Sequence, residues 1–207
     1  MIKRTPERIA GRREEIVNAC EKLYRTMSFK DITLKEIGGE VPFSRPTIYN
    51  YFQTKEEIFL ALFEREYDRW NGDLEEILTR EALTGEQLAG ELARSLERRQ
   101  QLLKLLAMNN YDMEANSRPE RLTAFKRAYG RSMENVRAIL TRFRPAMSEE
   151  EKDRFLYVFF PFMFGIYPYT AVTPGQRAAM EEAGVDYRYQ SVYEIARECL
   201  IRLLGDG

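Results

Sequence analysis

Residues 33–52 read TLKEIGGEVPFSRPTIYNYF, and this stretch predicts two short helices joined by a tight turn. Thr33 carries the kind of side chain that caps a helix start. The first helix is expected to end at Val41, because the residue before a proline is pushed out of the helical region. Ser44 is then expected to cap the second helix.

The second helix has two faces of different chemistry. Ile48 and Phe52 lie one turn apart, so both are expected to face inward. The opposite face carries hydrogen-bonding side chains: Arg45, Thr47, Tyr49, Asn50 and Tyr51. Taken one at a time, these aromatics fit a protein core and the arginine fits a solvated surface. Taken together at this spacing, they favour the recognition helix of a DNA-binding helix-turn-helix.

The pattern continues on both sides of this stretch. Its members are Thr33, Ile37, Ser44, Thr47, Ile48, Tyr49, Tyr51, Phe52, Lys55 and Glu56. With these residues aligned without insertion, the segment from Phe29 to Leu62 resembles the N-terminal domain of the TetR (tetracycline repressor) family. The resemblance covers about a sixth of the chain directly. It implies a ligand-responsive transcriptional regulator, by the family's commoner mode a repressor, that binds palindromic operator DNA as a homodimer.

The same resemblance implies roles for individual residues. Lys35 and Arg45 would read bases, since both can donate to guanine O6 and N7. Pro46 would meet a thymine methyl group, and Asn50 would read adenine or reach only the DNA backbone. Phosphate contacts are implied for Thr47, Tyr49, Tyr51 and Lys55, and Ser44 completes the predicted DNA-binding set. A basic arm is expected to add sequence-independent attraction: Lys3, Arg4, Arg8, Arg12 and Arg13.

One position departs from the family pattern. Pro42 stands where the family usually has a glycine in the turn. Proline has a fixed negative φ and cannot take the left-handed conformation, so the turn is expected to be built differently.

The rest of the chain predicts an all-α fold. Apolar residues recur at helical spacing almost throughout the 207 residues, and no run alternates as a strand does. Helix starts are marked by Ser or Thr followed three residues later by Glu or Gln. These pairs are Thr33/Glu36, Thr54/Glu57, Thr84/Gln87, Ser117/Glu120, Ser148/Glu151 and Ser191/Glu194. Adding Thr5 with Pro6, and Ser44, gives about eight or nine helices.

We expect two domains. Residues 1–53 form the predicted three-helix helix-turn-helix domain, and residues 54–207 form a helical effector-binding and dimerisation domain. The first 55 residues hold 11 Lys/Arg against 7 Asp/Glu, whereas the remainder holds 21 against 26. A basic DNA-binding part would thus be joined to an acidic part that stays off DNA.

Catalysis is not expected. The chain has no histidine, which is the commonest general acid/base and metal ligand. Its two cysteines, Cys20 and Cys199, lack metal-ligand spacing and are expected in the core. No nucleophile motif or phosphate-binding glycine loop is present, so we predict no enzyme, no cofactor and no metal. No signal peptide is apparent at the N-terminus, which favours a cytoplasmic protein.

The second domain is expected to mediate pairing. From Phe155 to Tyr169 the sequence has eight aromatic residues, which need cover on all sides. The interrupting prolines favour a buried helix over a membrane span. The family resemblance implies a four-helix dimer interface, which by position would use about Ser148 to Tyr167 and Ser191 to Leu204.

The resemblance also implies a small apolar or aromatic effector. Its predicted pocket is lined by Trp70, Met108, Tyr111, Phe125, Tyr129, Phe159 and Met163, with Asn109, Asn110 and Asp112 as polar contacts. Each of these residues equally fits a plain core position. The alternative function is a small-molecule sensor or carrier of the same fold that does not bind specific DNA.

Overall fold

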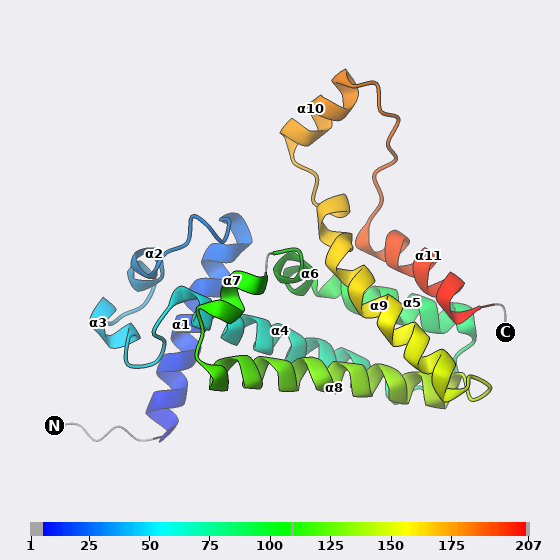
Figure 1. The fold of residues 1–207 in the computed structure, drawn as a ribbon, viewed down its shortest axis with the longest axis horizontal. Coiled ribbons are helices and arrows are strands. Elements are labelled where there is room, and N and C mark those ends of the chain that lie inside the picture. The colour runs from blue at the N-terminus through cyan, green and yellow to red at the C-terminus, as the bar shows by residue number, and fades with distance from the viewer. Residues whose placement is uncertain (1–5, 109, 206–207) are drawn as a thin grey trace. The chain divides into compact units, whose positions relative to one another are not determined.

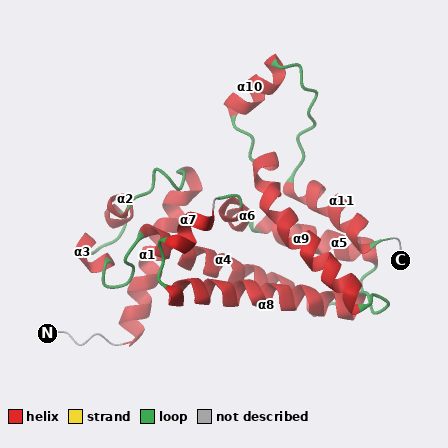
Figure 2. Cartoon of the chain, viewed as in Figure 1, coloured by secondary structure: helices red, strands yellow, loops and turns green. Residues whose placement is uncertain are grey.

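The computed structural model describes residues 6–108 and 110–205, excluding the side chains of residues 6 and 110–112. Within those ranges every regular element is a helix (Figure 2), so the all-α prediction is confirmed. The eleven helices are α1 (Pro6–Thr26), α2 (Leu34–Gly39), α3 (Arg45–Ile48), α4 (Lys55–Leu78), α5 (Gly85–Arg98), α6 (Gln100–Leu106), α7 (Asn110–Ala115), α8 (Pro119–Phe143), α9 (Glu149–Thr170), α10 (Pro174–Glu182) and α11 (Val192–Leu204).

The count exceeds the predicted eight or nine because α6, α7 and α10 have no predicted start. Arg99 leaves the helical region at φ −111° and ψ 43°, so α5 ends at Arg98 and α6 begins at Gln100. Helix α10 begins with a capping box formed by Thr173 and Gln176. That pair has the same Ser/Thr-x-x-Glu/Gln spacing as the predicted starts, and it was overlooked inside a proline- and glycine-rich segment.

Most of the predicted caps are present. Complete capping boxes form at Thr84/Gln87, Ser148/Glu151 and Ser191/Glu194. Ser117 was predicted to cap α8, and this is wrong. Its hydroxyl is buried and makes no hydrogen bond in the part of the chain that the structure describes. The segment ahead of α8 is held instead by Arg118, as described below.

The chain divides into two compact units. The first comprises Met1–Arg65 and Asn109–Arg127, and the second comprises Glu66–Met108 and Ala128–Gly207. These units do not coincide with the predicted division between residues 53 and 54. In the first unit, α2 packs on α1 and α3 packs on α2. Its core is aromatic at the centre, where Phe59 makes edge-on contacts with Tyr24 and Phe29 at centroid distances of 5.1 and 4.8 Å.

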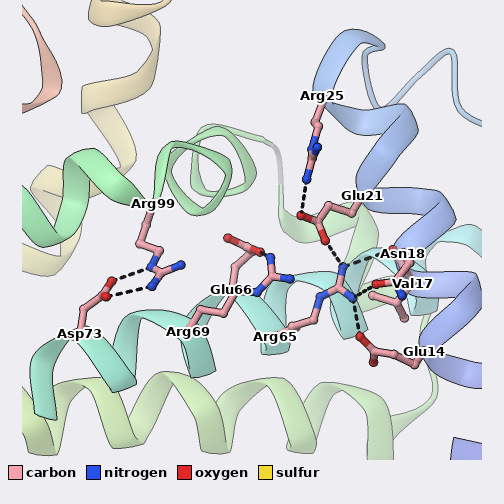
Figure 3. Close-up of polar contacts among 10 residues, drawn as sticks. All are labelled: Glu14, Val17, Asn18, Glu21, Arg25, Arg65, Glu66, Arg69, Asp73 and Arg99. Atoms are coloured by element: carbon pink, nitrogen blue, oxygen red, sulfur yellow. Dashed lines mark hydrogen bonds and ion pairs between the residues drawn. The ribbon is translucent and has the colours of Figure 1, made fainter. Parts of the chain in front are cut away.

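Arg65 fastens α4 to α1 within the first unit (Figure 3). Its Nη1 donates to Glu14 Oε1 at 2.7 Å and to Asn18 Oδ1 at 2.5 Å. Its Nη2 donates to Glu21 Oε2 at 2.5 Å, and only 14% and 12% of these two side chains are exposed. Its Nη2 also donates to the Val17 carbonyl at 3.4 Å, and a largely buried arginine that satisfies four acceptors fixes the spacing of the two helices.

The second unit is built on the pairing of α5 with α11, and α9 packs on both α6 and α11. Trp70 is fully buried and donates from Nε1 to Ser95 Oγ at 2.9 Å. Arg99 forms a two-pronged pair with Asp73 at 2.5 and 2.8 Å (Figure 3). Figure 1 shows α10 held on two loops beyond the ends of α9 and α11, and none of its residues is buried.

Replacing Arg65 with methionine is expected to lower the free energy of unfolding by about 2–3 kcal/mol, because it removes the ion pairs of Arg65 with Glu14 and with the largely buried Glu21. Urea unfolding at fixed protein concentration measures this. The matched control is Lys22→Met, which removes a surface pair with Glu40 in the same unit and should cost less than about 0.5 kcal/mol. Equal losses in the two variants would contradict the anchoring role of Arg65.

Candidate nucleic-acid interface

Helices α2 and α3 form the predicted helix-turn-helix, with shorter helices than expected. Thr33 caps α2 as predicted, and its Oγ1 accepts from the Lys35 backbone N–H at 3.1 Å. The helix ends at Gly39 and not at Val41, so that boundary was wrong. Glycine lowers helix stability by about 1 kcal/mol relative to alanine, and two of them close this helix.

The turn between the helices is made without any left-handed residue. In the described ranges only Gly184 and Gly205 have positive φ, and neither lies near this turn. The turn therefore accommodates Pro42 with negative φ throughout. Glu40 closes α2 in the right-handed region at φ −99° and ψ −3°. The expectation that this turn is built differently from a glycine turn is consistent with these angles.

Helix α3 is a single helical turn, and residues 49–51 continue it as turns outside the helix. Ser44 stands at the N-cap of α3 as predicted, but its side chain makes no capping hydrogen bond. The Ser44 hydroxyl lies 3.1 Å from Thr47 Oγ1 instead. Helical hydrogen bonding extends past the end of α3, since the Phe52 N–H donates to the Ile48 carbonyl at 3.0 Å. This bond keeps Ile48 and Phe52 one turn apart, and both side chains are fully buried as predicted.

The face opposite Ile48 and Phe52 is open to solvent. Six of the predicted DNA-binding residues are exposed: Lys35, Ser44, Arg45, Pro46, Tyr49 and Asn50. The other three are half-buried: Thr47, Tyr51 and Lys55. Tyr49 is 49% exposed, which is unusual for a side chain with so large an apolar ring. The segment thus presents polar and aromatic groups outward from an anchored inner face.

Lys55 has an internal role that the sequence did not predict. Its Nζ donates to the carbonyls of Phe29 at 2.8 Å and Ile32 at 3.1 Å, and it lies 4.1 Å from the centroid of the Phe29 ring. These contacts fasten the start of α4 to the loop that follows α1. A phosphate contact by Lys55 stays a prediction, and it would use the remaining ammonium proton.

Two arginines of α1 extend the basic surface of the first unit. The Arg12 guanidinium lies 4.4 Å from the centroid of the Phe43 ring, in the turn before α3. Arg13 reaches Glu64 at 3.5 Å and lies 5.7 Å from the Phe52 ring. Two further members of the predicted arm, Lys3 and Arg4, lie outside the described residues.

Two family models match the sequence. One, described as "Bacterial regulatory proteins, tetR family", matches residues 16–62. The other, described as "Tetracyclin repressor-like, C-terminal domain", matches residues 64–200 and so covers more than half of the chain. The chain belongs to the tetR family. Among curated proteins, none matches the sequence.

Solved structures of TetR-family regulators share the fold of this TetR-family protein. A TetR/AcrR-family regulator from Thermobifida fusca is 18% identical, with a TM-score of 0.62 and coverage of 94% of this chain and 97% of that one. FadR from Bacillus subtilis, in complex with stearoyl-CoA, is 16% identical, with a TM-score of 0.61 and coverage of 92% and 97%. FadR from Thermus thermophilus, in complex with lauroyl-CoA, is 22% identical, with a TM-score of 0.58 and coverage of 93% and 92%.

The sequence missed a polar centre behind the recognition segment of this TetR-family protein. Glu57 is fully buried, and its carboxylate accepts from Arg118 Nε at 2.5 Å, from Arg118 Nη2 at 2.8 Å and from the Gln53 N–H at 2.8 Å. Glu57 had been interpreted only as half of a capping box with Thr54. Thr54 Oγ1 does accept from the Glu57 N–H at 3.2 Å, but the carboxylate turns to Arg118, 61 residues away.

The described members of the predicted effector pocket are divided between the two units. Trp70, Tyr129 and Phe159 belong to an aromatic cluster of the second unit, in which Trp70 lies 6.4 Å from Phe159. Met163 is fully buried and Met108 is half-buried in the same unit. Phe125 belongs to the first unit and packs on Phe63 at 4.8 Å. The side chains of Tyr111, Asn109, Asn110 and Asp112 lie outside the described residues.

Two surface hollows lie in the second unit. One, of about 470 Å³, is lined by Pro168, Tyr169, Val172, Gln176, Ala179, Met180, Tyr187 and Tyr189. The other, of about 590 Å³, is lined by Arg144, Ala146, Met147, Glu151, Arg154, Phe155, Val158, Leu203, Leu204 and Gly205. Neither contains a predicted effector residue.

The described residues also bear on metal binding and on membrane insertion. No group of three His, Cys, Asp or Glu side chains there is arranged to hold a metal ion. No single described helix is long and apolar enough to cross a membrane, and α9 and α10 pass that test only as a pair bent by 81°.

Replacing Glu57 with glutamine is expected to destabilise the protein in a pH-dependent way. Burial raises the pKa of this carboxyl, but the hydrogen bonds from Arg118 and from the backbone N–H groups outweigh burial and hold the pKa below its usual value of 4.5. A depressed pKa contributes stability above pH 4.5 that is lost as the pH falls through the lowered pKa.

Urea unfolding of both proteins at pH 7 and at successively lower pH tests this. The gap between wild type and Glu57→Gln should be about 2–3 kcal/mol at pH 7 and should shrink in acid. Glu150→Gln, at an exposed position of α9, is the control and should change the unfolding free energy little. A gap that stays constant with pH would contradict the ion-pair account of Glu57.

Proposed function

We propose that this TetR-family chain is a transcriptional regulator, in its commoner mode a repressor, that binds palindromic operator DNA as a homodimer and is released by a small effector. The DNA-binding part would lie within residues 1–53, and effector binding and dimerisation within residues 54–207. The supporting observation is the exposed polar face on residues 45–51, which is backed by the fully buried Ile48 and Phe52. Its place of action would be the cytoplasm, and no residue is assigned a catalytic role.

The recognition face suits the major groove. Arg45 stands exposed at the first position of α3, from which its guanidinium can reach a guanine edge. Lys35 is exposed near the start of α2 and would read bases with it. Tyr49 and Asn50 project from the turn that follows α3, where Asn50 Nδ2 donates to the Thr47 carbonyl at 3.2 Å. We assign base reading to Arg45, Lys35 and Pro46, and base reading or a DNA-backbone contact to Asn50. Phosphate contacts are assigned to Thr47, Tyr49, Tyr51 and Lys55, and Ser44 completes the DNA-binding set.

The proposed dimer interface uses α9 and α11. Four large side chains of α9 are exposed in the single chain: Tyr157 (71%), Val158 (48%), Phe164 (41%) and Tyr169 (58%). Exposed apolar side chains that recur along one helix are typical of an interface with another protein. α11 packs beside α9 and can complete a four-helix arrangement with a second copy. Two recognition segments would then address half-sites about 34–36 Å apart.

The effector is proposed to be a small apolar or aromatic molecule bound in the second domain. Acyl-CoA thioesters are one class to test, because two FadR structures of the same fold were solved with lauroyl-CoA and stearoyl-CoA. The effector would stabilise a conformation in which the two DNA-binding parts are wrongly spaced for the operator. Release then follows from its differential affinity for the two states.

Operator binding tests the proposed function most simply. Duplexes selected by the wild-type protein from a randomised library serve as the operator, and binding is followed by fluorescence anisotropy. Sub-micromolar, salt-dependent binding is expected. Arg45→Ala should lower operator affinity by about ten- to a hundredfold. Tyr49→Ala should weaken binding to operator and scrambled duplex alike.

Arg188→Ala is the control for charge, because this arginine is exposed in the loop after α10. It should leave operator affinity unchanged. Uniformly weak binding of the wild type to every duplex would refute regulation and favour the alternative, a sensor or carrier that does not bind specific DNA.

Dimerisation is tested by Val158→Asp. A charge at this exposed position of α9 is expected to give a monomer in sedimentation-velocity runs, since it would be buried unpaired in the interface. Operator affinity should fall at least about a hundredfold, because one half-site then binds alone. Val185→Asp, at a similarly exposed valine (47%) in the loop after α10, should remain dimeric. A dimeric Val158→Asp variant would contradict this interface.

Effector response is tested by titrating lauroyl-CoA and stearoyl-CoA against the protein–operator complex. An effector must raise the melting temperature and lower operator affinity in the same concentration range. A ligand that raises the melting temperature and leaves operator binding unchanged would refute the proposed release mechanism for that ligand.

A further inference from the structure

The carbonyl of Tyr51 receives two arginine side chains from a distant part of the sequence. Arg121 Nη2 donates to it at 3.0 Å, and Arg118 Nη2 donates at 3.4 Å. These residues lie at the start of α8 and belong, with Tyr51, to the first unit. Tyr51 is the last residue of the recognition face, so the contact fixes the backbone on which that face ends.

Arg118 is itself held rigidly. Its guanidinium makes a two-pronged pair with the buried Glu57, and its backbone N–H also donates to Glu57 Oε1 at 3.2 Å. The other oxygen of that carboxylate accepts from the Gln53 N–H, which begins the segment leading into α4. The Glu57–Arg118 pair therefore joins the backbone on both sides of Phe52 to the start of α8, at Gln53 through the carboxylate and at Tyr51 through the guanidinium.

Arg121 is placed where stability alone would not favour an arginine. Its Nε is buried and has no hydrogen-bond partner in the described residues. Burial lowers the pKa of Arg121, and the neighbouring charges of Arg13 and Arg118 lower it further. The guanidinium lies 5.4 Å from the centroid of the Phe52 ring, and the Tyr51 carbonyl is its hydrogen-bond acceptor. Residues that break local rules of this kind are expected at functional sites.

We propose that Arg121, seated beside the Arg118–Glu57 pair, is a positioning residue for DNA recognition that acts through the Tyr51 carbonyl and not through a DNA phosphate. It holds the turn after α3 so that the base-reading residues Arg45, Pro46 and Asn50 meet the groove in one geometry. This inference rests on the proposed function. Because positioning serves base reading, its loss weakens binding to the operator and leaves sequence-independent binding as it was.

The test compares Arg121→Met with Arg127→Met. Methionine keeps an apolar stem and has no N–H donor. Arg127 is an exposed arginine of the same helix, so its replacement removes the same charge without touching Tyr51. Both variants and the wild type are titrated as full-length protein with the library-selected operator and with a scrambled duplex at several salt concentrations. Melting temperatures are recorded for all three.

Arg121→Met is expected to lose about tenfold in operator affinity relative to Arg127→Met. Its affinity for the scrambled duplex, its salt slope and its melting temperature should match those of Arg127→Met. Arg121→Lys, which restores a charged donor, should recover part of the operator affinity. A fall for both duplexes together with a salt slope lower by about one would identify a phosphate contact and overturn the proposal.

Two other results also overturn it. A lowered melting temperature with proportionate losses for both duplexes would mean that Arg121 only stabilises the fold. Unchanged operator affinity in Arg121→Met would remove any role in recognition. In either case, the proposed function stands if the wild type binds the operator more tightly than the scrambled duplex. If the wild type binds both duplexes equally, the proposed function and the role of Arg121 are both refuted.

Discussion

A helix of one turn cannot hold its own shape in water, because the cost of fixing its first residues is never recovered by further hydrogen bonds. Helix α3 spans only Arg45–Ile48, and its predicted side-chain cap does not form. Its geometry must therefore come from outside. Two constraints supply it: Ile48 and Phe52 are fully buried beneath the segment, and the carboxylate of Glu57 holds the chain behind it.

Because α3 is held from outside, the side chains around it fall into two groups. Those that hold the segment are engaged within the protein, including Lys55 on the Phe29 and Ile32 carbonyls and Arg118 on Glu57. Arg45 and Tyr49 remain exposed and available to a partner. Basic residues in this unit thus either support the fold or remain available to a partner, and a count of basic residues does not distinguish the two roles. Exposure and hydrogen-bond partners distinguish them.

Local patterns predicted much of the fold. The all-helical class, the inward pair Ile48 and Phe52 and three capping boxes follow from spacings of three or four residues, which physical chemistry ties to one helix turn. The Thr173/Gln176 box carried the same signal and was missed in a segment rich in proline and glycine. The Glu57–Arg118 pair joins residues 61 apart, and no local periodicity encodes such a contact. For the same reason the division into compact units, with 109–127 joined to the N-terminal segment, was not predictable.

In the proposed complex, residues 45–51 enter the major groove twice, once from each subunit. Methylation interference on a library-selected duplex tests it directly, because methylation of guanine N7 blocks the major groove. We predict two clusters of interfering guanines on one face of the duplex, with centres about 10 base pairs or a multiple of that apart. Interference that is absent, or confined to a single cluster at saturating protein, would contradict the account.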